Sequence, residues 1–214
     1  MGIIYSSKPL AKRRQYEHYP TASGLVEAML QIPIISQNEF QRVCDPSAGT
    51  GVFGAKYRTL FPRRNILHGV ELQPCLPNRH YDEWYMMDFF RFASIQRRSY
   101  DLIMGNPPYG GTHRDLAEMF VRTSIAMLED DGVLIFLLRS AFLEGQNRGK
   151  NLCSERQYRP SDIYQLSRRP SFTGNGKTDS TAYSAFVWNK GYECEYSRMW
   201  LLDWGYGEPI EEDN

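Results

Sequence analysis

The sequence of 214 residues has little of three things: long hydrophobic runs, cysteine and net charge. Its longest strongly apolar run covers residues 133–138, whereas a membrane-spanning helix needs about 20 apolar residues. Residues 1–12 lack the apolar core and cleavage pattern of a secretory signal. We therefore expect no membrane partner and a cytoplasmic location.

The four cysteines, Cys44, Cys75, Cys153 and Cys194, are scattered along the chain. No two of them have the close spacing of metal ligands, so a structural zinc site is not expected. We interpret all four as free thiols in a reducing cytoplasm. Hydrophobic residues make up 42% of the chain, which is enough for one sizeable core, and the length fits a single domain.

The zero net charge hides an uneven distribution, and local charge is what neutralises phosphates. Residues 136–180 contain eight Lys or Arg and four acids, whereas residues 191–214 contain seven acids and one Arg. We interpret the acidic stretch as a solvated tail that favours solubility. The basic stretch is consistent with a nucleic-acid surface, but Arg pairs are also common on ordinary surfaces.

Apolar periodicity and turn residues predict strands that alternate with helices through the first two thirds of the chain. The expected helices cover residues 23–30, 52–60 and 116–128, and the acidic turn 129–132 ends the last one. The expected strands cover residues 43–44, 66–72, 84–87, 102–104, 133–138, 163–166 and 182–188. This order indicates an α/β domain with a largely parallel sheet. Ligands of such sheets bind beyond the carboxyl ends of the strands, so motifs that follow strands should meet there.

The turn Asn106-Pro107-Pro108-Tyr109 follows the fourth expected strand. Adjacent prolines remove two backbone donors and fix two φ angles, so neither a helix nor a central strand continues through them. The turn would hold an amide oxygen, a proline carbonyl and an aromatic ring in fixed relation. These groups suit a planar substrate that carries an NH2 group. The alternative is a stiff strand-to-loop turn without a chemical role.

A glycine loop follows the first expected strand, and residues 49–54 match the dinucleotide-binding pattern G-x-G-x-x-G. Glu71 stands near the interval expected for an acid that binds a ribose, so a nicotinamide-dependent oxidoreductase is one interpretation. Asp45 argues against this interpretation, because a carboxylate directly before the loop would repel the pyrophosphate of a dinucleotide. A cofactor with a cationic sulfonium and an ammonium group would be attracted to Asp45 instead.

Five motifs occur in order: Tyr19-Pro20-Thr21, Asp45-Pro46-Ser47-Ala48-Gly49-Thr50-Gly51, Glu71, Asp88-Phe89-Phe90 and Asn106-Pro107-Pro108-Tyr109. Together they resemble the class I S-adenosylmethionine-dependent N6-adenine DNA methyltransferases of the Asn-Pro-Pro-Tyr type, and among these the small stand-alone enzymes of bacteriophages. Arg169-Pro170-Ser171-Phe172 and residues 176–180 are similar to a later segment of those proteins. The resemblance covers about residues 15–190.

The resemblance implies a fold and a cellular setting. The implied fold is Rossmann-like, with a mostly parallel seven-stranded sheet, helices on both faces and a late antiparallel strand. It would occupy a single methyltransferase domain over residues 1–214. The implied setting is a bacterial or phage-infected cell.

The resemblance also implies S-adenosylmethionine as the cofactor. The residues implied to contact it are Tyr19, Pro20, Thr21, Asp45, Pro46, Ser47, Ala48, Gly49, Gly51, Glu71, Leu72, Asp88, Phe89 and Asn106. The first three would meet the methionine end, and the glycine loop would surround methionine and ribose. Glu71 would accept hydrogen bonds from the ribose hydroxyls. Leu72 would flank the adenine, whose N6 group would donate to Asp88, with Phe89 packed nearby. Two alternatives stay open, namely Glu71 as a surface acid and Asp88 as a helix N-cap.

The proline turn would then act on an adenine of DNA. Asn106 and the Pro107 carbonyl would accept hydrogen bonds from its NH2 group, which favours a nitrogen whose lone pair can reach the methyl group. Pro108 keeps the turn rigid. A base inside a duplex cannot be reached, so the adenine would be flipped out and stacked on Tyr109.

A basic insertion at residues 145–177 is the candidate segment for target recognition. We expect it after the fifth strand and on the active-site side. Its candidate DNA-binding residues are Arg148, Lys150, Arg156, Tyr158, Arg159, Arg169 and Lys177. The alternative is a flexible basic surface loop.

Other functions are compatible with the same turn. An adenine-specific RNA methyltransferase or a protein glutamine N-methyltransferase would also act on a planar NH2 group. A catalytically idle nucleic-acid-binding module could keep the fold, although it would not need every acid and glycine of the motifs. Basic residues interleaved with an aromatic one favour nucleic acid over protein, so we expect DNA as the partner.

Overall fold

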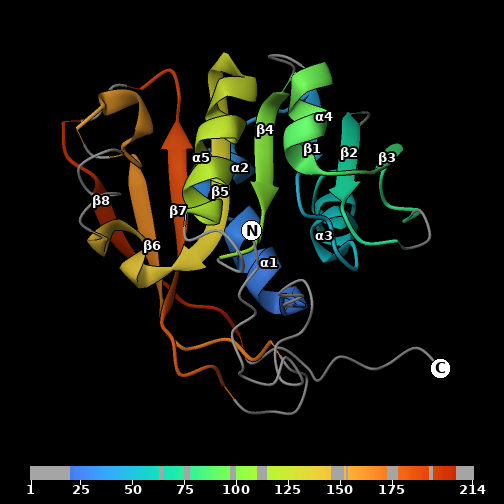
Figure 1. Cartoon of the computed structure of the whole chain (residues 1–214). Coiled ribbons are helices and arrows are strands. Elements are labelled where there is room, and N and C mark those ends of the chain that lie inside the picture. Colours follow the sequence, from blue (N-terminus) through green and yellow to red (C-terminus); the bar gives the residue numbers. More distant parts are fainter. Residues whose placement is uncertain are drawn as a thin grey trace, which may run out of the picture.

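The computed structural model describes residues 20–62, 65–74, 78–96, 100–109, 115–145, 152, 154–172, 178–192 and 195–205. The strands are β1 Arg42–Asp45, β2 Ile66–Glu71, β3 Glu83–Met86, β4 Tyr100–Gly105, β5 Leu128–Arg139, β6 Asp162–Leu166, β7 Tyr183–Asn189 and β8 Arg198–Leu202. The helices are α1 Ser23–Leu30, α2 Pro33–Ser36, α3 Val52–Leu60, α4 Phe89–Ile95 and α5 Leu116–Met127, with 3-10 turns η2 Ser140–Glu144 and η3 Arg156–Tyr158. In Figure 1, α4 and α5 lie in front of the sheet, whereas α2 and α3 lie behind it.

The strands of the described residues form one sheet in the order β3-β2-β1-β4-β5-β7-β6-β8. Pairs among β1 to β5 are parallel, β7 runs antiparallel to both β5 and β6, and β8 runs parallel to β6. The order reverses between β1 and β4, because the chain goes outward through β2 and β3 before it returns. Ligands of open α/β sheets bind at such a point. We call the side at which β1, β2 and β4 end the carboxyl side, and the opposite side the amino side.

The core centres on β4, β5 and β7, whose residues are covered on both faces of the sheet. Leu102, Ile103 and Met104 of β4 are fully buried, and residues 133–138 of β5 are buried without a break. Strands with two covered faces show continuous apolar runs rather than alternation, which is why these short runs marked strands in the sequence. Among the described residues, no helix is long and apolar enough to cross a membrane.

The predicted fold class is confirmed, since the sheet is mostly parallel and carries a late antiparallel strand. The expected count of seven strands is not, because the described residues alone form a sheet of eight. The additional strand, β8, lies within the stretch that we interpreted as a solvated tail. A ladder to β6 holds it, together with an ion pair of 2.8 Å from Arg198 Nε to Asp162 Oδ1. Acids dominate the composition of this stretch, but pairing with β6 makes residues 198–202 a strand although most of them are exposed.

The acidic turn after α5 also differs from the prediction. The helix ends at Met127 as its periodicity indicated, but residues 129–131 belong to β5 and are exposed. The register with β4 shifts here, because Tyr100 pairs with Leu128 whereas Leu102 pairs with Val133. An irregularity in the ladder therefore accommodates the acids at the start of the strand.

Candidate active site

Asp45 and Asn106 come together because β1 and β4 are parallel neighbours that end side by side. Asp45 is the last residue of β1, and Asn106 directly follows β4. Gly105 leaves room between them, since a Cβ there would lie 3.0 Å from Asp45 Oδ1 and 3.5 Å from Ser47 Oγ. The carboxyl side thus joins the acid of the glycine loop to the amide of the proline turn.

The Asn106 side chain is held at both ends. Its Nδ2 donates a hydrogen bond to Thr21 Oγ1 at 3.0 Å, and its Oδ1 accepts one from the Tyr109 hydroxyl. Thr21, Pro107 and Tyr109 are all buried. The amide therefore has a defined orientation, and Thr21 from the amino-terminal segment contributes to it.

Tyr109 belongs to an aromatic cluster built from the ends of β5 and β7. The Arg139 guanidinium lies 5.5 Å from the centre of the Tyr109 ring, and the Tyr183 ring lies 5.4 Å from it. Phe172 packs edge-on against Tyr183 at 4.9 Å, and the Tyr183 hydroxyl donates to Asp179 at 2.8 Å. The cluster supports one face of the proline turn with aromatic and cationic groups.

The Asp45 carboxyl group is fully buried and hydrogen-bonded through both oxygens. Its Oδ2 accepts from the Tyr81 hydroxyl at 2.8 Å, and its Oδ1 accepts from the Ser47 backbone N–H at 3.2 Å. Burial raises the pKa of Asp45 to about 7, against the opposing effect of the hydrogen bond from Tyr81. A cationic ligand group would favour the ionised form of this acid.

Glu71 braces the glycine loop rather than standing apart as a surface acid. Its Oε2 accepts from the Gly49 backbone N–H and its Oε1 from that of Gln73, each at 2.8 Å. The loop needs its glycines, because Gly49 and Gly51 have φ angles of 53° and 84°. The ribose contact of Glu71 stays a prediction, and a carboxylate has lone pairs left for it.

Asp88 and its neighbours follow β3 on the same side of the sheet. Asp88 is exposed and caps α4, since its Oδ1 accepts from the Arg91 backbone N–H at 3.0 Å. Phe89 is buried and stacks on Phe120 at 4.9 Å, whereas Leu72 is 54% exposed. The N-cap alternative is therefore present, and the contacts with a cofactor adenine stay predictions.

The loop fits S-adenosylmethionine in its donors and acceptors. Ser47 Oγ is buried and has no hydrogen-bond partner among the described residues, which is costly unless a ligand satisfies it. It lies beside the Asp45 carboxylate, so an ammonium group and a carboxylate of one amino acid would each find a partner here. Within the described residues, no group of three or more His, Cys, Asp or Glu is placed to hold a metal ion.

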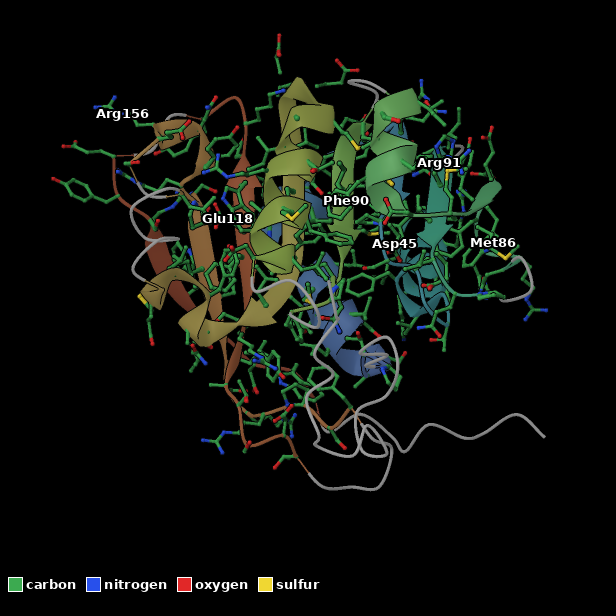
Figure 2. All side chains as sticks on the ribbon, viewed as in Figure 1. Asp45, Met86, Phe90, Arg91, Glu118 and Arg156 are labelled. Carbon is green, nitrogen blue, oxygen red and sulfur yellow. The ribbon has the colours of Figure 1, made fainter. Side chains whose placement is uncertain are left out.

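Three of the candidate DNA-binding residues lie away from this site. Arg156, Tyr158 and Arg159 precede β6, which runs parallel to β5, so they lie on the amino side. The Tyr158 carbonyl accepts from Trp188 Nε1 at 2.8 Å near the end of β7. In Figure 2, Arg156 is at the upper end of the molecule, whereas the arrow of β4 in Figure 1 points downward to the carboxyl side. The expected placement of these three on the active-site side was therefore wrong.

Of six further predicted residues, two are described by the structure and four are not. Arg169 is exposed and follows the end of β6, so it lies on the carboxyl side together with Arg168. Pro20 is half-buried next to Thr21. The predicted residues Tyr19, Arg148, Lys150 and Lys177 lie outside the described residues.

Three residues of the site were missed by the sequence analysis: Tyr81, Arg139 and Tyr183. Arg139 and Tyr183 are paired across β5 and β7. Their positions at the end of β5 and the start of β7 were the one sequence signal that could have indicated them. Tyr81 carries no local signal, because it comes before β3 and reaches Asp45 across the face of the sheet.

No protein-family model and no curated protein sequence matches the chain. Solved structures do match. A type I restriction-modification methyltransferase subunit from Streptococcus thermophilus has a TM-score of 0.66 at 16% identity, over 87% of this chain and 47% of that one. A "putative class I S-adenosylmethionine-dependent methyltransferase" from Listeria monocytogenes has a TM-score of 0.68 at 13% identity, over 89% and 67%. A "putative RNA methyltransferase" from Pyrococcus horikoshii has a TM-score of 0.59 at 14% identity, over 86% and 89%.

At these identities the likeness concerns the fold. The chain has the class I methyltransferase fold. It spans about half of the type I subunits, 47% of the one from S. thermophilus and 48% of one from Vibrio vulnificus.

Proposed function

We propose that the chain is an S-adenosylmethionine-dependent methyltransferase that acts on the N6 amino group of adenine in DNA. The observation that carries the proposal is the meeting of the buried Asp45 carboxylate and the clamped Asn106 amide across Gly105. A carboxylate suits the cationic end of the cofactor, and an amide oxygen suits an NH2 group. The class I methyltransferase fold supports assigning both to one reaction.

The residues of the chain would position the reacting amine rather than remove a proton with a strong base. When bound, S-adenosylmethionine supplies an electrophilic methyl group, whose transfer to nitrogen releases a neutral thioether. The N6 lone pair of adenine is delocalised into the ring. Asn106 Oδ1 and the Pro107 carbonyl would accept both N–H groups and so favour a pyramidal nitrogen with an available lone pair. After transfer, N6 carries a positive charge and would lose one of its protons to solvent water, since these two oxygens accept hydrogen bonds but are too weakly basic to keep a proton.

Tyr109 would take part in both binding and access. Its hydroxyl donates to Asn106 Oδ1, the oxygen that the adenine amine would use, so an arriving base would share this oxygen with the hydroxyl or displace it. The ring would then stack on the flipped base, backed by Arg139 and Tyr183.

DNA is the acceptor that we favour over RNA and over a glutamine side chain. The basic carboxyl-side residues Arg139, Arg168 and Arg169 support a nucleic acid, and the matched subunits of restriction-modification systems support DNA. RNA is the second candidate, because the chain covers 89% of the P. horikoshii protein but only about half of the type I subunits. A bacteriophage origin and a cytoplasmic location stay predictions.

Product analysis tests this function. The chain is incubated with methyl-labelled S-adenosylmethionine and with DNA, RNA or protein, and the labelled product is identified after digestion. N6-methyladenine in DNA is the expected product. Labelled RNA or methylglutamine would select another acceptor, and cofactor binding without transfer to any acceptor would contradict the function.

Asn106→Ala tests the mechanism. We expect methyl transfer to fall on the order of a hundredfold or more, because an acceptor that acts on the reacting amine is lost. Cofactor affinity, measured by calorimetry, should change much less. Asn38→Ala is the matched control, since its exposed side chain donates to the Ile34 carbonyl before β1. Near-normal turnover of Asn106→Ala would contradict the mechanism.

A further inference from the structure

Tyr81 connects two elements that flank the glycine loop. It lies in the connection between β2 and β3 and is 7% exposed. Its hydroxyl donates to Asp45 Oδ2 at 2.8 Å and accepts from the Gly54 backbone N–H at 3.2 Å. One hydroxyl thus joins the acid at the end of β1 to the first turn of α3.

Two glycines make room for the Tyr81 ring. A Cβ at Gly54 would lie 2.5 Å from Tyr81 Cζ and 2.9 Å from its hydroxyl oxygen. A Cβ at Gly69 of β2 would lie 2.8 Å from Tyr81 Cδ1. Real side chains do not tolerate such distances, so both positions need glycine to admit the ring. Gly54 is the third glycine of the G-x-G-x-x-G pattern, and the close approach of Tyr81 explains it.

The same connection supports the other end of the loop. Asn78 Nδ2 donates to the Thr50 carbonyl at 2.8 Å, and a Cβ at Gly51 would lie 2.1 Å from that nitrogen. The segment 78–81 therefore contacts the loop at Thr50 and Gly51 and contacts its acid at Asp45.

We propose that Tyr81 is a positioning residue for cofactor binding, whose hydroxyl holds the Asp45 carboxylate in place for the cationic amino-acid end of S-adenosylmethionine. This inference rests on the proposed function. The hydroxyl is a neutral donor, so it stabilises the charged carboxylate without cancelling the charge that attracts the cofactor.

The electrostatic surroundings of Asp45 indicate that the Tyr81 hydroxyl would affect the pKa of this carboxyl group. Among the described residues, the titratable groups around it are Cys44 on its own strand, Glu71 on β2 and Tyr81, whereas β4 and α3 present Gly105 and Gly54. Burial raises the pKa of Asp45 to about 7 although Tyr81 opposes it. Burial also raises the pKa of Tyr81 well above its usual value, so its hydroxyl stays a donor. Loss of that donor would raise the pKa of Asp45 further.

Tyr81→Phe tests the proposal through the pH dependence of S-adenosylmethionine binding. Wild-type affinity should fall as pH falls through about 7, because Asp45 takes up a proton. In Tyr81→Phe the fall should begin at higher pH, and affinity near pH 7 should be about tenfold lower. The difference should shrink toward about pH 9, where Asp45 is ionised in both proteins. The ratio of the two dissociation constants cancels the titration of the cofactor's own amino group.

Tyr57→Phe is the matched control. Tyr57 belongs to α3 and is also buried, and its hydroxyl accepts from Asn65 Nδ2 at 2.9 Å without contact to Asp45. It should lose some stability and keep wild-type binding at each pH. Gly54→Ala, which would push the ring away, should reproduce the binding defect of Tyr81→Phe.

Each outcome separates the two proposals. If the wild type binds no S-adenosylmethionine at any pH, the proposed function fails. If the wild type binds and Tyr81→Phe binds equally well, or shows a loss that does not vary with pH, only the role of Tyr81 fails. A loss shared by Tyr57→Phe would likewise attribute the effect to general destabilisation and overturn the inference.

Discussion

At the scale of single residues, the Tyr109 hydroxyl and the amine of an adenine would compete for one oxygen, Asn106 Oδ1. The ring is the part of Tyr109 that a flipped base needs, whereas the hydroxyl occupies one of the two lone pairs of the oxygen that the base would use. Thr21 holds the other end of the same amide, so the oxygen stays in place when the hydroxyl leaves.

Tyr109→Phe should therefore improve base capture. We expect KM for DNA to fall about two- to tenfold, the effect of one ordinary hydrogen bond, with kcat nearly unchanged. Tyr109→Ala should raise KM, because it removes the stacking surface. Steady-state kinetics on both variants measure this, and an increase of KM in Tyr109→Phe would show that the hydroxyl assists binding.

Sequence patterns identified the residues whose chemistry is visible locally. Their types and spacing were informative, because Asp45 and Glu71 end strands, Asn106 directly follows one, and Gly49 and Gly51 form the glycine loop. The contacts that join Glu71 to Gly49 and Asn106 to Thr21 were not visible, and neither was Tyr81 as the partner of Asp45.

At the scale of elements, helix α4 is capped by Asp88, the residue that the family resemblance predicts to bind the cofactor. Asp88 caps α4 through the Arg91 N–H, and α4 packs on α5 through Phe89 and Phe120. The same carboxylate is the predicted acceptor for the cofactor's adenine. Its two roles can be separated, because asparagine caps helices about as well as aspartate but carries no charge.

Asp88→Ala should lower the free energy of unfolding by about 1 kcal/mol, whereas Asp88→Asn should leave it nearly unchanged. If Asp88 also accepts from the adenine, both variants should bind S-adenosylmethionine more weakly. Urea unfolding and calorimetry measure the two effects. If both variants bind S-adenosylmethionine as tightly as the wild type, Asp88 caps α4 but does not contact the cofactor.

Elements with their own periodicity or flanking turns agreed with the sequence prediction, and α3 agreed at both ends. β8 was not predicted, because its residues are nearly all exposed and only pairing with β6 holds them as a strand. The short helix α4 was also missed, since its apolar residues form no long periodic pattern.

At the scale of the whole molecule, the topology separates the basic residues into two groups. Arg139, Arg168 and Arg169 lie on the carboxyl side, where Arg139 contacts the Tyr109 ring, whereas Arg156 and Arg159 lie on the amino side. Only the first group is near the strand ends where a flipped base would enter.

Arg169→Gln should therefore weaken DNA binding, and the slope of log affinity against log salt should become shallower by about one. Arg156→Gln is the matched control, since it removes the same charge from an exposed position on the amino side. It should change little. Salt titrations of both variants with one duplex measure this, and equal effects would place the DNA on a different surface.

The sequence by itself determined the α/β class, most strands and the order of the motifs, because periodicity, proline and glycine act on the backbone within a few residues. Only the tertiary structure decided that Tyr81 reaches Asp45, that Thr21 holds Asn106, and that Arg156 lies on the far side. These facts follow from strand order and direction, which depend on pairing between segments far apart in the chain. The direction of β6 alone separates Arg156 before it from Arg169 after it.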